Sequence, residues 1–173
     1  MSETPEPLED LRTAMSVGTA AQTAIQHADS KAALLLTGLT GAGALTADQP
    51  GIVAVAVRTG ALATIATIGL GAAIVVGVAA AVWHLGRCLA PRLTAPESAV
   101  GNRFALPDLG AHRRPLTPAP MEQQRDEAWA AAEVLAGIAM EKYRAIRASL
   151  PWAALAVVGS IGWLCVAIVT DTR

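Results

Sequence analysis

The sequence is poor in charged and aromatic residues. Charged residues make up 16% of its 173 positions and aromatic residues 3%, whereas an average soluble domain carries about 25% charged residues. This deficit argues against a chain wetted on all sides and for one that keeps much of its length out of water. The formal net charge of -1 excludes the strongly basic face typical of nucleic-acid-binding proteins, so we expect no nucleic-acid partner.

Cysteines and motifs of catalysis are also scarce. Cys88 and Cys165 are too few for a disulfide framework. The acidic start, MSETPEPLEDLR, lacks the basic residues and apolar run of a secretory signal. The sequence contains no phosphate-binding glycine loop, nucleophile elbow or HExxH motif, and His84 with Cys88 gives only two of the ligands that a zinc site needs. We therefore expect neither an enzyme nor a metal site.

Apolar residues, in contrast, make up 53% of the chain and gather in three uncharged stretches. The stretches at 59–86 and 151–170 are long enough as helices to cross a hydrocarbon core of about 30 Å. The stretch at 32–47 is about 24 Å long as a helix, so it crosses only if the preceding turn is helical and Lys31 reaches toward the headgroups. Its alternative interpretation is a buried helix of a soluble protein.

The basic residues give these stretches an orientation. Of the 13 lysines and arginines, only Arg58 and Arg173 fall outside the N-terminal segment and the segment between the second and third stretches. Basic residues favour the cytoplasmic side, so we predict an all-α, three-span membrane protein with a cytoplasmic N-terminus. Its segments are a cytoplasmic N-terminal helix (1–31), a transmembrane helix (32–47), an external loop (48–58), a second transmembrane helix (59–86), a cytoplasmic loop and helix (87–150), a third transmembrane helix (151–170) and an external tail (171–173).

Two cytoplasmic helices are predicted to pack together under the membrane. A stripe that recurs every three or four positions predicts a helix over Leu8 to Lys31, and this helix leads directly into the first apolar stretch. The stripe is apolar at its start and becomes polar toward the membrane, at Gln22 and Asp29. Prolines interrupt the segment 87–120, which we expect to be a loop. A second helical stripe follows in 121–150, made of Trp129, Ala132, Ala136, Ala139, Tyr143 and Ile146.

Small residues at helical spacing predict close helix contacts inside the membrane. Gly69, Ala73 and Gly77 follow one another every four residues in the second apolar stretch. Looser pairs occur in the other two stretches, at Gly38 with Gly41 and at Gly159 with Gly162. Such residues let helix backbones approach closely, although the pattern does not say which helix each one meets.

Charged residues lie at the inner edges of the first and third stretches. Asp29 and Lys31 are two positions apart and do not face each other on a helix. A carboxylate at that depth is costly without a partner, so we predict that Asp29 pairs with Lys142, Arg144 or Arg147. Contact with water among the lipid headgroups is the alternative.

Four short motifs follow one another along the chain: Ala28-Asp29-Ser30-Lys31-Ala32, Pro91-Arg92-Leu93, NRFALPDL at 102–109 and Lys142-Tyr143-Arg144-Ala145-Ile146-Arg147-Ala148. In the order and spacing of these motifs, the chain resembles the membrane-spanning effectors of Pycsar, the bacterial pyrimidine-cyclase antiphage system. The positions that carry the family motif at the expected helix interface are Ala28, Asp29, Lys31, Ala32, Lys142, Tyr143, Arg144 and Arg147.

The resemblance implies an effector of abortive infection in the bacterial inner membrane. A partner pyrimidine cyclase would make cyclic UMP, which we favour over cyclic CMP, and the effector would respond by impairing membrane integrity. No other cofactor is expected. A holin-like protein that permeabilises the membrane without a nucleotide, and a membrane scaffold for a partner enzyme, are the alternatives.

The nucleotide pocket, if this chain has one, is expected to be unconventional. Segment 87–150 lacks the alternating strand patterns of a β-roll nucleotide domain. A pocket between protomers could use arginine for phosphate and an aromatic ring for the base. The candidates are Arg103, Phe104, Arg113, Arg114 and Tyr143. Because three helices do not enclose a wide pore, a pore would also require a homo-oligomer.

Overall fold

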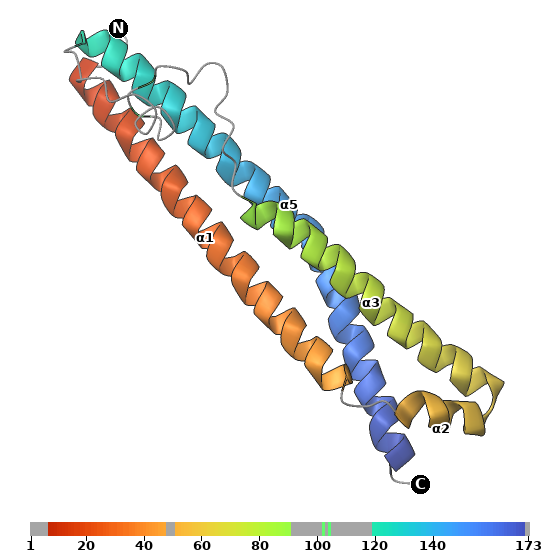
Figure 1. Cartoon of the computed structure of the whole chain (residues 1–173). Helices are drawn as coiled ribbons and strands as arrows, with labels where there is room; N and C mark the ends of the chain where they lie inside the picture. The colour runs from red at the N-terminus through yellow and green to blue at the C-terminus, as the bar shows by residue number, and fades with distance from the viewer. Residues whose placement is uncertain (1–6, 48–50, 91–101, 103, 105–118, 172–173) are drawn as a thin grey trace, which may run out of the picture. The chain divides into compact units, whose positions relative to one another are not determined.

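The computed structural model describes residues 7–47, 51–90, 102, 104 and 119–171, and all elements in these ranges are helices (Figure 1). They are α1 (Pro7–Ala47), α2 (Gly51–Thr59), α3 (Ala61–Leu89) and α5 (Met121–Asp171). The described residues contain no strand, so the all-α prediction is confirmed for them. The chain divides into two compact units, each of which takes part of α1 and part of α5. Unit 1 is Met1–Ala28 with Ala90–Tyr143, and unit 2 is Asp29–Leu89 with Arg144–Arg173.

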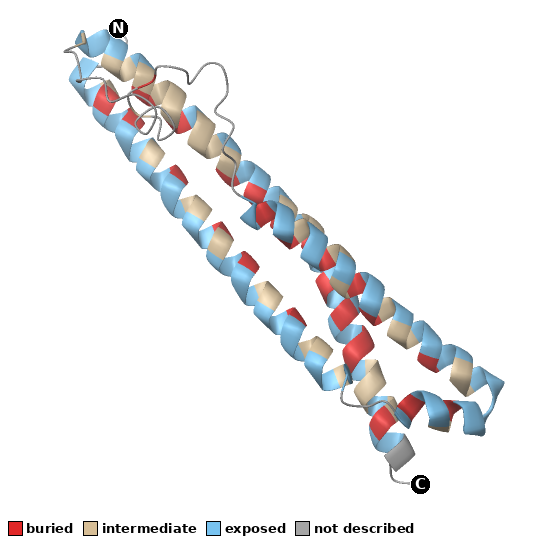
Figure 2. Cartoon of the chain, in the orientation of Figure 1, coloured by how far each residue is buried: buried red, intermediate tan, exposed pale blue. Residues whose placement is uncertain are grey.

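Helix α1 is continuous from the N-terminal segment into the first apolar stretch, as the sequence predicted. Its buried and half-buried side alternates in steps of three and four residues, which is the seven-residue repeat of coiled coils (Figure 2). The fully buried members are mostly alanines, and they are Leu11, Ala14, Ala21, Ala28, Ala32 and Leu39. Small side chains on this side allow a neighbouring helix to approach closely.

Helix α5 is also continuous, so the predicted start of the third transmembrane helix at Pro151 does not separate it from the cytoplasmic helix before it. Proline lacks a backbone N–H, so inside a helix it leaves the carbonyl four residues before it without a partner. The buried repeat nevertheless keeps its spacing on both sides of Pro151, which shows that packing of this side outweighs the local cost. The buried members are Ala128, Ala132, Ala139, Lys142, Ile146, Ser149, Ala153, Ala156, Ser160 and Ala167.

The segment 48–58, expected as an external loop, contains helix α2. Ile52 and Ala56 of α2 are 3% exposed, and α2 contacts α3. One residue, Gly60, joins the two helices at φ 133°, a conformation that only glycine adopts without strain. Its N–H donates to the carbonyl of Ala56, and its carbonyl accepts from the N–H of Thr64, so Gly60 completes one helix and begins the next.

Two described helices, and not the three predicted, are long and apolar enough to cross a membrane. They are α3 and the apolar part of Met121–Val169 in α5. The 32–47 part of α1 does not reach that standard because glycines and threonines dilute its leucines, and Lys31 lies at its start. The structure therefore supports two spans by length and hydropathy. The crossing by 32–47, expected only if the preceding turn is helical and Lys31 reaches toward the headgroups, stays a prediction.

Candidate functional site

The start of α1 and the start of α5 meet in a small apolar cluster of unit 1. Leu11 and Ala14 of α1 are buried against Ala128 of α5, and Phe104 and Trp129 pack around them half-buried. Further along, a side chain at Gly18 would only just touch Ala132 and Leu135, at 4.0 Å. The small side chains at Ala14, Gly18 and Ala128 leave room in this cluster for the large rings of Phe104 and Trp129.

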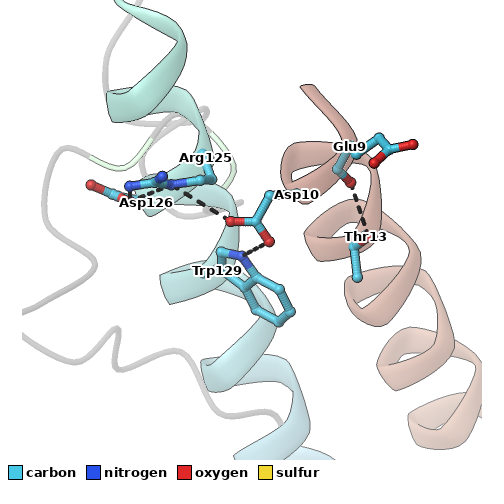
Figure 3. Close-up of polar contacts among 6 residues, drawn as sticks. All are labelled: Glu9, Asp10, Thr13, Arg125, Asp126 and Trp129. Carbon is cyan, nitrogen blue, oxygen red and sulfur yellow. Dashed lines mark hydrogen bonds and ion pairs between the residues drawn. The ribbon is translucent and has the colours of Figure 1, made fainter. Parts of the chain in front are cut away.

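A carboxylate from α1 reaches across this cluster to α5. Oδ1 of Asp10 accepts a hydrogen bond from Nε1 of Trp129 at 3.2 Å, and its Oδ2 lies 3.8 Å from Nε of Arg125 (Figure 3). The sequence analysis predicts no role for Asp10. It places Trp129 in an apolar stripe and assigns no partner to the indole N–H, so it does not link the two residues. The indole N–H fixes the ring direction, so this contact sets how the two helices are aligned in unit 1.

Arg125 is held between two carboxylates. Its Nε and a terminal nitrogen donate to Oδ1 of the adjacent Asp126, at 2.9 and 2.7 Å, and Asp10 lies on its other side. The Asp126 carboxylate, through these bonds and its charge, raises the pKa of Arg125 above its ordinary value, and the charge of Asp10 adds to this. The guanidinium is therefore charged at every physiological pH, and its strongest bonds go to its own helix.

Asn102 attaches the segment before α5 to the side of α5. Its Nδ2 donates to the carbonyl of Glu127 at 2.7 Å, and its Oδ1 accepts from the N–H of Phe104 at 2.8 Å. The second bond is the side-chain turn that asparagine forms with the backbone two residues on. With 5% of its surface exposed, Asn102 uses both ends of its amide to hold Phe104 against the cluster. The resemblance in NRFALPDL thus includes two residues with a clear structural role.

The motif residues before the first apolar stretch occupy different sides of α1. Ala28 and Ala32 are completely buried, Asp29 is half-buried and Lys31 is exposed. The alanines are the positions of the buried seven-residue repeat, which explains why the motif places small residues on both sides of its charges.

The second motif places an unexpected residue on the buried side of α5. Lys142 is 8% exposed, whereas Tyr143, expected in the apolar stripe, is 36% exposed. A repeat of seven residues counted from Ala128 and Ala132 would have identified this, because it reaches 142 and not 143. Arg144 and Arg147 are exposed. The predicted pairing of Asp29 with Lys142, Arg144 or Arg147 stays a prediction.

Of the five nucleotide-binding candidates, two fall within the described residues. Phe104 packs against the apolar cluster and Tyr143 is partly exposed, while Arg103, Arg113 and Arg114 lie outside the described residues, as does Pro91-Arg92-Leu93. The role of the five residues therefore stays a prediction. Within the described ranges, no group of three His, Cys, Asp or Glu residues is arranged to hold a metal ion.

Glycines bring α3 and α5 into backbone contact in unit 2. A side chain at Gly77 would lie 2.9 Å from the carbonyl of Trp152 and from the amide nitrogen of Ala156. One at Gly159 would lie 2.8 Å from Ile74, and one at Gly162 would lie 2.9 Å from Leu70. The predicted role of small residues in helix contact is confirmed at these positions.

Other glycines of the same pattern have no such neighbour. Gly69, Gly38 and Gly41 have nothing within 4 Å of where a side chain would begin. Near this contact, the hydroxyl of Ser160 and the indole N–H of Trp163 are buried and have no hydrogen-bond partner among the described residues. A side chain at Gly71 would lie 3.4 Å from the Trp163 ring.

Comparison with known proteins identifies the family to which the chain belongs. The model of the Pycsar effector protein domain matches residues 13–170, a range that takes in most of each unit and most or all of every helix in the described part of the chain. No curated protein and no solved structure is similar enough to count as a match. The resemblance in the short motifs is therefore confirmed over nearly the whole sequence: the chain belongs to the Pycsar effector family, and its role is that of an antiphage effector.

Proposed function

We propose that this chain is a membrane effector that a cyclic pyrimidine nucleotide activates, cyclic UMP more readily than cyclic CMP. A partner pyrimidine cyclase makes the nucleotide on infection, and the activated effector impairs the integrity of the inner membrane, so that the infected cell stops growing. The observation that carries the proposal is the family match over residues 13–170. The effector has no catalytic step of its own in this proposal.

The exposed surface of unit 2 supports action in a membrane. Large aliphatic side chains are exposed along α3 and the second half of α5, where a soluble protein would place polar ones. They include Leu62, Ile65, Ile68, Val75, Val76, Val157, Val158, Ile161, Ile168 and Val169. Small residues such as Gly77, Ala81, Ala153 and Ala156 lie on the buried side, as is common where helices pack closely inside lipid.

Contacts within unit 1 also support a membrane crossing by the 32–47 part of α1. Asp10 contacts Trp129, and Asn102 contacts the carbonyl of Glu127, so the starts of α1 and α5 and the residues after α3 lie on one side of the membrane. If α3 crosses, α2 lies on the opposite side. The chain between Ala28 and α2 must then cross too, and its only uncharged stretch is 32–47.

The polar side chains of that stretch are satisfied within the helix. The hydroxyls of Thr37, Thr40 and Thr46 donate to carbonyls three or four residues earlier at 2.8–3.3 Å. Such bonds lower the cost of placing threonine in lipid, because the hydroxyl no longer needs water. With most basic residues in 1–31 and 87–150, the positive-inside rule then places unit 1 in the cytoplasm and the N-terminus with it.

The signal would be recognised in the cytoplasmic part. Arginine can pair with the cyclic phosphate and an aromatic ring can stack on the base, so Arg103, Phe104, Arg113, Arg114 and Tyr143 remain the proposed contacts. Since Phe104 is half-buried against the apolar cluster, we propose that a homo-oligomer completes the pocket. A pore would require the same homo-oligomer.

Dye leakage from liposomes that contain the purified full chain tests the proposal. Leakage with cyclic UMP, weaker leakage with cyclic CMP and none without nucleotide is the expected result. Leakage regardless of nucleotide would overturn the gating and favour a holin-like protein. Absence of leakage under every condition, with the chain shown to be inserted, would favour a scaffold.

Matched variants locate the nucleotide. Arg113→Gln with Arg114→Gln removes two proposed phosphate contacts, whereas Arg12→Gln removes an exposed arginine of α1 that is not among the candidates. We expect the double variant to need a higher nucleotide concentration for the same leakage and the control to behave as the parent. Equal responses would remove Arg113 and Arg114 from the site.

A further inference from the structure

Helix α2 exposes an apolar face that has no role in the proposed nucleotide site or in the proposed spanning helices. Val53 and Val57 lie one helical turn apart and are 41% and 60% exposed, while Ile52 and Ala56 beside them are buried. Directly after Gly60, Leu62 is 86% exposed. This segment therefore exposes aliphatic side chains on both sides of the sharp turn at Gly60.

The length of α2 restricts what it can do in a membrane. Its nine residues span about 13 Å, far less than a hydrocarbon core of about 30 Å. A helix this short does not cross a bilayer. The positive φ of Gly60 turns α2 away from the direction in which α3 begins (Figure 1), so α2 does not simply extend the spanning helix.

A single charge marks the other face of α2. Arg58 is exposed, and it is the only formally charged residue between Asp48 and Arg87. On a helix, Gly51 and Arg58 share one side because they are seven residues apart, whereas Val53 and Val57 share another. Apolar side chains on one face and a cation on the other are the features of a helix that lies flat at a lipid surface.

We infer that α2 is an interfacial helix, with Val53 and Val57 inserted into the outer leaflet of the inner membrane and Arg58 among the lipid phosphates. The inference rests on the topology proposed above, which places α2 on the outer side. Lipid fits better than a protein partner because the aliphatic face continues into Leu62 and Ile65 at the start of α3, a helix apolar enough to span. Through Gly60, α2 would fix the depth at which α3 sits.

Site-specific fluorescence in vesicles tests this directly. The full chain carries Cys165→Ser, which removes the exposed cysteine, while Cys88 is 1% exposed and stays unlabelled. Val57→Cys is labelled with an environment-sensitive dye and placed in vesicles of phosphatidylethanolamine and phosphatidylglycerol, some with bromine near the glycerol end of the acyl chains. Gly51→Cys is the matched control, because it has open space around it and lies on the face of Arg58.

We expect bromolipid to quench the dye at Val57 at least about twofold more than the dye at Gly51, with iodide in the water showing the reverse order. Equal quenching at both sites would overturn the inference. Protection of Val57 from bromolipid and from iodide alike would also overturn it, and would assign the face to a protein, such as a second copy of this chain.

A third label separates this inference from the proposed function. Val75→Cys, on the exposed side of α3, reports whether the chain is inserted at all. Quenching at Val57 and Val75 without nucleotide-dependent leakage would leave the interfacial helix in place and remove the proposed gating. Quenching at neither site would show that the chain is not inserted, and both proposals would fail.

Discussion

The two units bury the same kinds of residue and expose different ones. Alanines fill many of the buried positions that recur every three or four residues along α1 and α5 in both units. In unit 1 the outward positions include Glu9, Arg12 and Glu133, whereas in unit 2 they include Ile65 and Val158. Small residues on the buried side thus suit helix packing both in water and in lipid. The exposed side chains decide whether a unit is stable in water or in the membrane.

The units also differ in how their helices are fixed in register. Unit 1 uses side-chain hydrogen bonds, from Trp129 to Asp10 and from Asn102 to α5. Unit 2 uses backbone proximity at Gly77 and Gly159. If this comparison is correct, adding one methyl group should damage unit 2, while removing one hydrogen-bonding group should damage unit 1.

The largest effect is expected for Gly77→Ala. The new methyl group would meet backbone atoms of Trp152 and Ala156 at 2.9 Å, and backbone cannot move away without separating the helices. We expect the free energy of unfolding to fall by about 1–3 kcal/mol. Far-UV circular dichroism in mixed micelles titrated with SDS measures this loss.

Two other glycines calibrate that result. Gly69→Ala adds the same methyl group to open space, so we expect stabilisation of up to about 1 kcal/mol from helix propensity. Gly159→Ala should cost less than Gly77→Ala, because the atom that it meets is Cγ1 of the Ile74 side chain, which can change rotamer. If Gly69→Ala were as harmful as Gly77→Ala, backbone proximity would not be what fixes unit 2.

The next effect is expected for Asn102→Ala in unit 1. The substitution removes two hydrogen bonds of a residue that is 5% exposed, so we expect a loss of about 1–3 kcal/mol. Hydrogen exchange by NMR should show the amide of Phe104 exchanging faster, because its acceptor is gone. Gln123→Ala is the control, since Gln123 bonds the exposed carboxylate of the same Glu127. Similar exchange at Phe104 in both variants would contradict the assigned role of Asn102.

Periodicity predicted the helices of this chain more accurately than their ends. The sequence predicted α1 as one helix from Leu8 onward and α5 from Met121 onward, and both are confirmed. The predicted third transmembrane helix begins at Pro151, where a missing N–H is tolerated in a first turn, yet the helix and its buried repeat continue through this residue. Local rules fail there because packing along the whole helix outweighs one missing bond.

The candidate site was less accessible to sequence reasoning. A repeat of 3.6 residues places Tyr143 in the stripe, whereas the repeat of 3.5 found in the structure buries Lys142. Asp10 and Trp129 are 119 residues apart, and no local pattern links residues that distant. Asn102 carried a usable local signal, because asparagine side chains commonly hydrogen-bond the backbone two residues on.

A smaller effect is expected for the Asp10–Trp129 hydrogen bond. Asp10→Asn and Trp129→Phe each remove one partner while keeping most of the packing, and their combination completes a double-mutant cycle. We expect a coupling energy of about 0.5–1.5 kcal/mol. Hydrogen exchange of the first turns of α1 and α5 measures it within unit 1 alone. Strictly additive effects would mean that the apolar cluster, and not this bond, aligns the two helices.

The smallest effect is expected for Asp126→Asn, although Oδ1 of Asp126 lies only 2.7 Å from a terminal nitrogen of Arg125. Asp126 is 67% exposed and adjacent to Arg125, so water and salt screen the pair and it links no two helices. The substitution should bring the raised pKa of Arg125 closer to its ordinary value, but the guanidinium stays protonated across the neutral range in either case. Its contribution would be lost only as the pH rises through the folded-state pKa. We therefore expect the exchange rates of α1 to be unchanged, and a change as large as that of Asp10→Asn would show that charge, and not the bond to Trp129, fixes unit 1.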